Sequence, residues 1–385
     1  MDLPTLAYAE AVRLPGVEFV DLRSPSEFAH DHLPGARNVP LFDDRQRAVV
    51  GTLYCRESPA AAWREGLRIV EERLAGLLAE ILGEPVPDRA WRRRFHELTA
   101  PGRDPAFQRE FRWLAPSEPP PAPLVLHCWR GGMRSRSVVA LMHALGIHRA
   151  IHLAGGYKGY RAWVRERLAA FDPATPLIVL RGPTGVGKTR ILARLEEAAP
   201  GATIDLEGLA RHRSSILGDV GLEPVGQKAF ESALADRLGR LGPPPWFIEG
   251  ESRKVGDVVL PEPLFRAMEE GIQIRLDAPL AHRVEVLAAD YLPTPAHAAE
   301  LRARLPFLEK RLGRTWTGRL RAWLDRGEWR RVAEVLLERY YDPRYGHHDR
   351  RRRWAAEFNA ADPGLVADLL AFRARRGGRG ASAGG

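Results

Sequence analysis

Twice in this chain a short apolar run leads directly into a glycine-rich loop and then into a helix-forming stretch. The first unit comprises residues 124–126 followed by the loop 127–135, and the second comprises residues 177–180 followed by the loop 182–189. A strand that enters such a loop at the start of a helix directs several backbone N–H groups to one point, which favours an anion. The two units therefore predict an α/β fold with parallel strands and two anion sites.

Chain length indicates how many domains contain these two strand-loop-helix units. A chain of 385 residues exceeds one ordinary core and suits two domains. We predict a first domain at 1–172 with a helical insertion at about 60–115, where apolar residues recur on one helical face. A parallel-sheet P-loop domain with a helical C-terminal part follows at 173–372, and a disordered basic tail is predicted at 373–385.

Composition narrows the class of protein. The net charge of +9 comes mainly from arginine, which favours a polyanionic partner, although genomic base composition is an equally good explanation. Apolar runs are far shorter than the ~20 residues of a membrane span, and the N-terminus does not have the pattern of a secretion signal. With two cysteines and no need for a disulfide, the chain is expected to be a soluble, cytoplasmic protein with a working thiol.

Cys128 is the candidate nucleophile. It follows a predicted strand, and backbone amides at the start of the next helix would lower the pKa of its thiol and bind a tetrahedral anion. Glycines allow the loop to bend, and arginines pair with anion oxygens. The predicted anion loop consists of Trp129, Arg130, Gly131, Gly132, Met133, Arg134 and Ser135.

This cysteine loop is typical of two enzyme classes. Five residues between Cys128 and Arg134, followed by a hydroxyl residue, match the loop of cysteine phosphatases. The loop also resembles that of rhodanese-type sulfurtransferases, and residues 21–28 and 32–38 resemble the N-terminal motifs of rhodanese-like domains. Because some phosphatases share that fold, the resemblance predicts a rhodanese-like first domain and leaves the chemistry open.

The second loop has the pattern of a phosphate-binding P-loop, between a strand and a helix. Lys188 would neutralise phosphate oxygens, and Thr189 would hold Mg²⁺ if the ligand is a nucleotide. Glu249 and Glu251, after another predicted strand, are candidate acidic residues for metal or water, and solvated carboxylates are equally consistent with the pattern. No certain metal site and no tightly bound cofactor are predicted. The predicted P-loop consists of Gly182, Pro183, Thr184, Gly185, Val186, Gly187, Lys188 and Thr189.

Taken together, the two loops and several further motifs resemble the bacterial tRNA 2-selenouridine synthase family, which joins a rhodanese domain to a P-loop domain. The matching segments follow the family order over most of the chain: 128–135, 155–161, 182–189, 205–213, 227–232, 249–254 and 340–345. One segment departs from the family, because residues 51–58 have Cys55-Arg56 where a lysine and a glutamine are usual. Cys55 is therefore either a second thiol near the site or an incidental small residue.

The resemblance implies a transferase that acts on the wobble uridine of certain tRNAs. In this family a 2-thiouridine is S-geranylated from geranyl diphosphate, and selenium from selenophosphate then replaces the geranylthio group. By analogy, Cys128 is the nucleophile or carrier of the selenium step, and the P-loop binds the diphosphate of the donor or a nucleotide. Implied partners are tRNA and an enzyme that produces selenophosphate.

Two further segments are candidate tRNA contacts. Lys158 and Arg161 could meet phosphates, and Tyr157 and Tyr160 could stack on bases, or all four could simply complete the fold of the first domain. The basic segment 347–354 has the same two interpretations. Two rival functions stay open: a rhodanese-fold cysteine phosphatase joined to a kinase-like P-loop module, and a non-enzymatic RNA-binding regulator, against which the intact loop at Cys128 argues.

Overall fold

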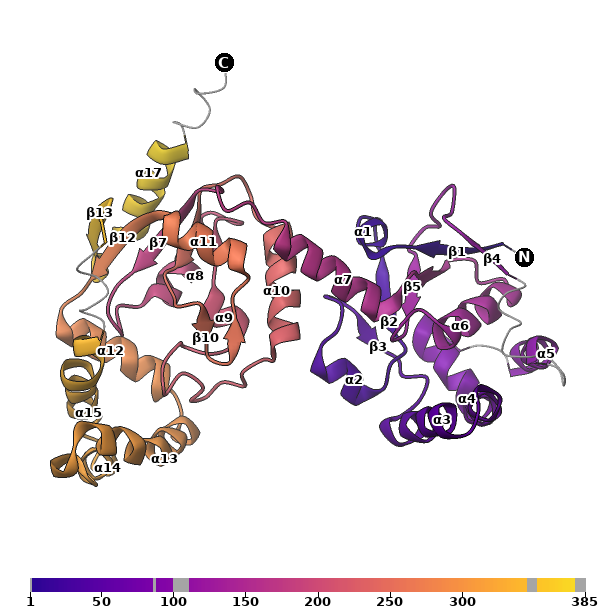
Figure 1. Cartoon of the computed structure of the whole chain (residues 1–385), viewed down its shortest axis with the longest axis horizontal. Helices are drawn as coiled ribbons and strands as arrows, with labels where there is room; N and C mark the ends of the chain where they lie inside the picture. The colour runs from indigo at the N-terminus through magenta and orange to yellow at the C-terminus, as the bar shows by residue number, and fades with distance from the viewer. Residues whose placement is uncertain (1, 86–87, 100–110, 345–351, 378–385) are drawn as a thin grey trace, which may run out of the picture. The chain divides into compact units, whose positions relative to one another are not determined.

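The computed structural model describes residues 2–85, 88–99, 111–344 and 352–377 (Figure 1). It separates into two compact units, Met1–Arg167 and Leu168–Gly385, and each contains a parallel sheet. The mixed α/β fold predicted from the sequence is confirmed. The division falls inside helix α7 (Gly156–Ala169), somewhat before the boundary at residue 172 that the sequence suggests.

The first unit is built on a six-stranded sheet with the order β3-β2-β5-β6-β1-β4, and every neighbouring pair is parallel. Strand β5 is buried along its whole length, which explains its unbroken apolar sequence. The strands are β1 (Asp2–Leu6), β2 (Glu18–Asp21), β3 (Arg37–Asn38), β4 (Arg112–Leu114), β5 (Leu124–His127) and β6 (Ala150–Leu153).

Helices of the first unit pack around this sheet. The predicted insertion is helical in α4 and α5, but its last described part is strand β4 and not helix. Helix α4 buries Leu74, Leu77 and Leu78 against the same core as β5 and α6. Helical structure begins earlier than predicted because Asp43 caps α3, accepting a hydrogen bond from the Gln46 N–H at 2.7 Å. Residues 100–110 of the insertion lie outside the described residues. The helices are α1 (Tyr8–Ala11), α2 (Pro25–His30), α3 (Asp44–Arg56), α4 (Pro59–Leu82), α5 (Asp88–Thr99) and α6 (Met133–Ala144).

The second unit has a five-stranded parallel sheet with the order β13-β12-β7-β9-β8 and a short β10–β11 hairpin. Its strands are β7 (Leu177–Arg181), β8 (Thr203–Ile204), β9 (Trp246–Glu249), β10 (Lys254–Val255), β11 (Val258–Val259), β12 (Ile272–Asp277) and β13 (Ala356–Asn359). The helices around it are α8 (Lys188–Ala198), α9 (Leu206–Ala210), α10 (Gln227–Gly239), α11 (Glu262–Glu270) and α17 (Leu365–Gly377).

A second apolar core of this unit lies among helices rather than against the sheet. Leu217, Leu305, Leu308 and Leu320 are among its buried residues. The predicted helical C-terminal part of this domain is present, with strand β13 as an addition. Its elements are α12 (Leu280–Tyr291), α13 (Pro295–Leu312), the 3-10 turn η2 (Arg314–Trp316), α14 (Arg319–Asp325), α15 (Trp329–Leu336) and the π-helical segment η3 (Leu337–Tyr341).

Two predictions about the chain as a whole also meet the structure. The predicted disordered tail is wrong at its start, because residues 373–377 continue α17, whose residue Phe372 is buried in the sheet core. Residues 378–385 lie outside the described residues. Among the described residues, none of the helices combines the length and apolar character that crossing a membrane requires.

Candidate active sites

Cys128 lies at the carboxyl edge of the first sheet. It follows β5 directly, and the neighbouring strand β2 ends at Asp21, which pairs in register with His127. From β2 the chain moves outward to β3, whereas from β5 it moves to β6 on the opposite side. In parallel sheets a crevice for ligands forms where the strand order diverges in this way. The fold therefore places the predicted nucleophile at the expected position for a binding site.

The start of α7 holds the Cys128 loop in shape. The Tyr157 N–H donates to the Cys128 carbonyl and the Lys158 N–H to the Trp129 carbonyl, both at 2.9 Å. Gly156 has φ +55°, and a Cβ there would overlap the Cys128 carbonyl oxygen. The glycine pair at 155–156 is therefore needed because two backbone segments meet without room for a side chain.

The thiol itself is almost enclosed. Cys128 is 3% exposed, and its Sγ lies 3.3 Å from the Ser135 Oγ. Beside it, from Trp129 outward, opens a pocket of about 420 Å³. The pocket is lined by Arg23, Ser24, Ser26, Glu27, His30, Asp44, Arg47, Ala48, Trp129 and Tyr157.

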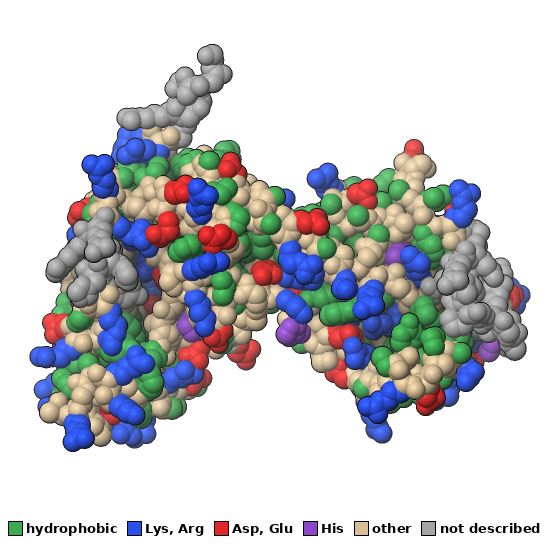
Figure 2. Space-filling model, viewed as in Figure 1, with side chains coloured by type: hydrophobic (Ala, Val, Ile, Leu, Met, Phe, Trp, Pro, Cys, Tyr) green, Lys and Arg blue, Asp and Glu red, His purple; other side chains and the backbone are tan. Residues whose placement is uncertain are grey.

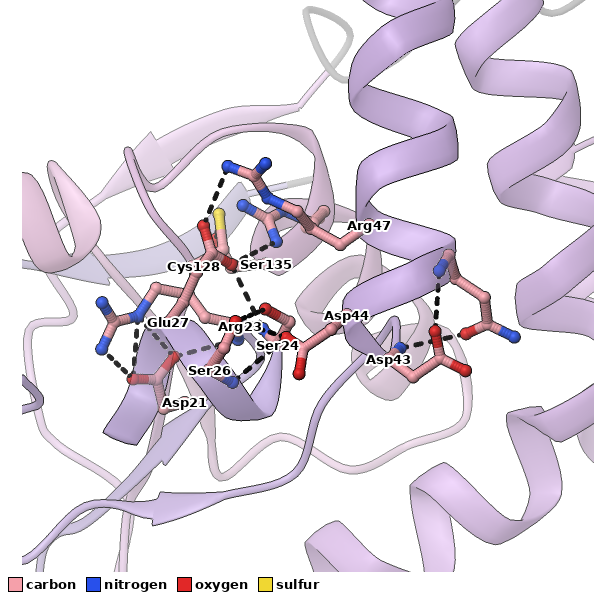
Figure 3. Close-up of polar contacts among 12 residues, drawn as sticks. Asp21, Arg23, Ser24, Ser26, Glu27, Asp43, Asp44, Arg47, Cys128 and Ser135 are labelled. Atoms are coloured by element: carbon pink, nitrogen blue, oxygen red, sulfur yellow. Dashed lines mark hydrogen bonds and ion pairs between the residues drawn. The ribbon is translucent and has the colours of Figure 1, made fainter. Parts of the chain in front are cut away.

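Paired charges from three elements surround the thiol (Figure 3). The Glu27 carboxylate on α2 meets Arg47 of α3 at 3.3 Å and Arg134 of the cysteine loop at 3.6 Å. Arg23 is buried, pairs with Asp21 and stacks on the Tyr157 ring with 3.9 Å from its guanidinium carbon to the ring centroid. Arg134, a predicted anion ligand of this loop, is therefore already paired with Glu27, so an incoming anion must compete with this carboxylate.

The sequence analysis missed most of this pocket. Arg47 and Asp44 come from α3, and Asp44 accepts hydrogen bonds from the Ser26 N–H at 3.1 Å and the Ser26 hydroxyl at 2.5 Å. These hydrogen bonds lower the pKa of the exposed Asp44 carboxyl. Ser26 and Glu27 lie in residues 21–28, a segment that predicted the fold and no site. The capping box of Ser24 and Glu27 at the start of α2 was the available signal.

The predicted tRNA contacts near α7 need correction. Tyr157 and Tyr160 are 2% and 1% exposed, so their rings cannot stack on a base without opening the fold. Arg161 is also buried and lies 3.8 Å from the Asp31 carboxylate. These three side chains complete the fold of the first unit, whereas Lys158 is exposed and remains a candidate.

Two other predicted features are placed by the structure. Cys55 is an exposed free thiol on α3, and Cys128 is also free. Most of the basic segment 347–354 lies outside the described residues. On the face shown in Figure 2, Lys and Arg side chains are scattered with Asp and Glu between them rather than gathered in one patch.

The P-loop follows β7, the central strand of the second sheet, and ends at the start of α8. Gly185 and Gly187 have φ +81° and +86°, which explains glycine at both positions. A Cβ on Gly185 would lie 2.9 Å from the Arg283 carbonyl oxygen of α12. The loop therefore has the strand-to-helix setting that the sequence predicts, and α12 packs closely on it.

Carboxylates gather beside the P-loop because β8 and β9 end at the same edge as β7. Lys188 lies 3.4 Å from Glu251, and the Thr189 hydroxyl donates to Glu207 at 3.0 Å. The Glu207 N–H donates to Glu249 at 2.6 Å. The sequence singled out Glu249 and Glu251 but gave no role to Glu207 or its neighbour Asp205, which follow a strand of only two residues.

Burial makes these carboxyls weak acids. Burial, with the nearby charge of Glu251, raises the pKa of Glu207 to about 7. Burial also raises the pKa of Glu249 well above its usual range, and Asp205 and Glu207 add to the effect. Among the described residues, the Glu249 Oε2 is buried without a hydrogen-bond partner. Glu249 therefore holds its proton more strongly than an ordinary carboxyl does, and Glu207 is close to half protonated near pH 7.

A metal at this site would have few protein ligands. Within the described ranges, no group of three or more His, Cys, Asp or Glu side chains is arranged to hold a metal ion. Mg²⁺ commonly binds through one or two protein groups together with phosphates and water. Thr189 and Glu207 fit that pattern, as a hydroxyl at the end of the P-loop and the carboxylate that it contacts.

The second unit, with its P-loop on the central strand of a parallel sheet, defines a phosphate-binding α/β enzyme. Residues 175–372 match the family described as tRNA 2-selenouridine synthase AAA domain. A relative named tRNA 2-selenouridine synthase, from Cupriavidus necator, is 32% identical over 97% of this chain and 100% of its own length. The one from Aeromonas salmonicida is 30% identical over 89% of this chain and 90% of its own. The chain belongs to the tRNA 2-selenouridine synthase family.

One solved structure also aligns with part of the chain. It is described as the N-terminal domain of a putative ATP/GTP binding protein from Clostridium difficile 630. The alignment covers 42% of this chain and 98% of that chain, with 28% identity and a TM-score of 0.31.

Proposed function

We propose that this enzyme converts wobble 2-thiouridine of tRNA into 2-selenouridine in two steps. The first is S-geranylation from geranyl diphosphate, and the second is replacement of the geranylthio group with selenium from selenophosphate. The observation that carries the proposal is the presence of two anion loops of different chemistry in one member of this family. One loop has a thiol beside arginines, and the other has a lysine beside weakly acidic carboxyls.

The first step suits the P-loop. Its amides and Lys188 would hold the donor diphosphate, with Lys188 exchanging its contact with Glu251 for phosphate oxygens. Mg²⁺ at Thr189 would supply further charge neutralisation. The thiouridine sulfur bonds to C1 of the geranyl chain, the C1–O bond breaks, diphosphate leaves and N3 of the base loses its proton. Alkylation makes the sulfur a better leaving group for the second step.

The second step suits Cys128, within what we infer to be a rhodanese-like unit. The thiolate adds to C2 of the alkylated base and geranylthiol leaves. Selenium of selenophosphate then displaces Cys128, and water cleaves the P–Se bond to release phosphate. Arg134 and Arg47 would hold the selenophosphate oxygens once Glu27 yields them. A carrier with selenium on the cysteine sulfur is less suitable, because transfer of neutral selenium would leave phosphorus reduced.

The partners follow from this chemistry. The substrates are tRNA in the cytoplasm, geranyl diphosphate and selenophosphate, and a selenophosphate-producing enzyme supplies the last of these. The proposed reaction uses no tightly bound cofactor. Lys158, exposed at the start of α7, is the residue of that segment that could contact tRNA phosphates.

Mass spectrometry of wobble nucleosides tests the proposal. We expect tRNA that carries 2-thiouridine to gain a geranyl group with geranyl diphosphate alone, and to become 2-selenouridine when selenophosphate is added. Selenouridine formation without any geranyl donor would refute the two-step route. Robust turnover of a chromogenic phosphate ester that is lost in Cys128→Ala would instead favour the phosphatase alternative.

A further inference from the structure

An apolar cavity lies in the helical core of the second unit. Its wall includes Leu287, Ala288 and Tyr291 of α12, Trp329 and Ala333 of α15, and Tyr341 of the π-helical segment η3. Leu287, Tyr291 and Tyr341 belong to an apolar core distinct from the one that covers the sheet, and Trp329 and Ala333 belong to a smaller cluster that Leu287 also contacts. Its lining is almost entirely hydrocarbon and aromatic, so it suits an apolar group and no anion.

One wall of this cavity is in contact with the P-loop. The Cγ of Leu287 lies 3.3 Å from the position of a Cβ built on Gly185. One turn earlier on α12, the Arg283 side chain donates through Nε to the Thr184 carbonyl at 2.9 Å. The same helix therefore supports the phosphate loop with one residue and lines the cavity with the next turn.

A second part of the lining is connected to the same arginine. Arg283 also donates to the Asp342 carboxylate, at 3.0 Å through Nη1. Asp342 directly follows the π-helical segment η3, which provides Tyr341 to the cavity. π-helical turns occur frequently at functional sites. Arg283 thus joins the P-loop, α12 and the segment that closes the cavity.

We propose that this cavity binds the isoprenoid chain of the diphosphate donor while the P-loop binds its diphosphate, an inference that rests on the proposed function. The carboxylates at the other side of the P-loop exclude a hydrocarbon, and so do the charges around Cys128. The aromatic rings of Tyr291, Trp329 and Tyr341 line the cavity, and such rings stabilise the positive charge that an allylic carbon develops as diphosphate leaves.

Binding would change the local packing. The cavity has an open volume of about 30 Å³, enough for roughly two water molecules. A ten-carbon chain is larger, so it enters by moving side chains at the contact between α12 and α15. We expect Leu287 and η3 to move, because both line the cavity and Arg283 contacts the segments on which they depend.

The test compares two ligands of the full-length protein by calorimetry. The affinity for inorganic diphosphate measures binding at the P-loop alone, and the affinity for geranyl diphosphate measures binding at the P-loop and the cavity together. Ala333→Leu fills the cavity. We expect it to lower the affinity for geranyl diphosphate at least tenfold and to leave the affinity for inorganic diphosphate unchanged. Ala289→Leu, at an exposed position of α12, is the matched control and should change neither affinity.

A second variant, which enlarges the cavity, tests whether a folding defect explains the first result. Trp329→Ala enlarges the cavity, and we expect it to improve binding of farnesyl diphosphate relative to geranyl diphosphate. Equal affinities of Ala333→Leu and Ala289→Leu for geranyl diphosphate would overturn the inference, as would a parallel loss of both ligands in Ala333→Leu. If the wild-type enzyme binds geranyl diphosphate no better than inorganic diphosphate and geranylates no tRNA, the proposed function fails instead.

Discussion

The loops at Cys128 and at Lys188 share one architecture and differ in what surrounds them. Each follows a parallel strand and precedes a helix, so each presents backbone amides at a carboxyl edge. Around Cys128 the carboxylate of Glu27 is paired with two arginines and the pocket opens to solvent. Around Lys188 burial raises the pKa of Glu207 and of Glu249, and an apolar cavity adjoins the loop.

This difference shows that the loop selects an anion while its neighbours select the chemistry. An arginine–carboxylate pair releases a guanidinium to any competing anion, which suits a small, exchangeable ligand. Buried carboxyls beside a lysine make the charge of the site depend on protonation, which suits a donor whose diphosphate must bind and then leave. If the two sites act independently, variants at one should leave the reaction at the other intact.

The largest effect is expected when the Cys128 thiol is removed, because the selenium step should be lost while the geranyl step continues. Cys128→Ala should lower selenium incorporation by ~10³-fold or more, the scale of losing a covalent nucleophile. Geranylated tRNA should still accumulate, because the P-loop is untouched. Mass spectrometry of the wobble nucleoside measures both products, and Cys55→Ala is the matched control. Selenouridine formed by Cys128→Ala would show that the nucleophile is elsewhere.

The reciprocal variant is Lys188→Ala. Loss of a charge that neutralises the leaving diphosphate should lower the rate of geranylation by about 10²-fold. Conversion of tRNA that is already geranylated should proceed at the wild-type rate, because that step uses Cys128. Initial rates on the two tRNA substrates distinguish the steps. A slow second step in Lys188→Ala would mean that the sites do not act separately.

A backbone variant tests the support of the cysteine loop. Gly156→Ala places a methyl group against the Cys128 carbonyl at a positive φ, so we expect a loss of about 1–3 kcal/mol in unfolding free energy and a slower selenium step. Gly76→Ala is the control, because a Cβ at that position on α4 meets nothing within 4 Å. Chemical denaturation measures the stability change. Equal stability of the two variants would show that the close contact between Gly156 and the Cys128 carbonyl does not require a glycine.

The smallest effect concerns pH at the P-loop. With a pKa of about 7, Glu207 is largely neutral in mild acid and ionised in mild base, where its charge repels phosphate. Affinity for inorganic diphosphate, measured without Mg²⁺, should therefore fall severalfold between about pH 6 and about pH 8. Glu207→Gln should flatten this dependence. An unchanged slope in Glu207→Gln would assign the titration to another group.

The sequence predicted best what lies within one continuous segment. Strands β5 and β7 contain the two apolar runs, and their loops carry glycines at positions where the structure requires them. Strand β1 was missed because Pro4 and Asp2 conceal its pattern, and β13 because it is short and half exposed. These strands are specified by their neighbours in the sheet more than by their own residues.

The cysteine pocket shows why the rest of the site could not be predicted. Glu27, Asp44 and Arg47 become neighbours of Cys128 because β2 pairs with β5 and α3 packs beside α2, and no local pattern states either contact. At the P-loop, Glu207 joins Thr189 because β8 lies two strands from β7 in the sheet. These contacts depend on the order of the strands in the sheet, and that order is a property of the whole domain.

The near-complete enclosure of the Cys128 sulfur limits which nucleotides the enzyme can modify. Cys128 is 3% exposed, so in the proposed reaction a base reaches its sulfur only after turning out of its stack. Unpaired anticodon residues make this rotation at little cost, whereas a paired thiouridine must first break a helix. If the proposed function holds, selection of the nucleotide therefore depends first on how easily the RNA releases the base from its stack.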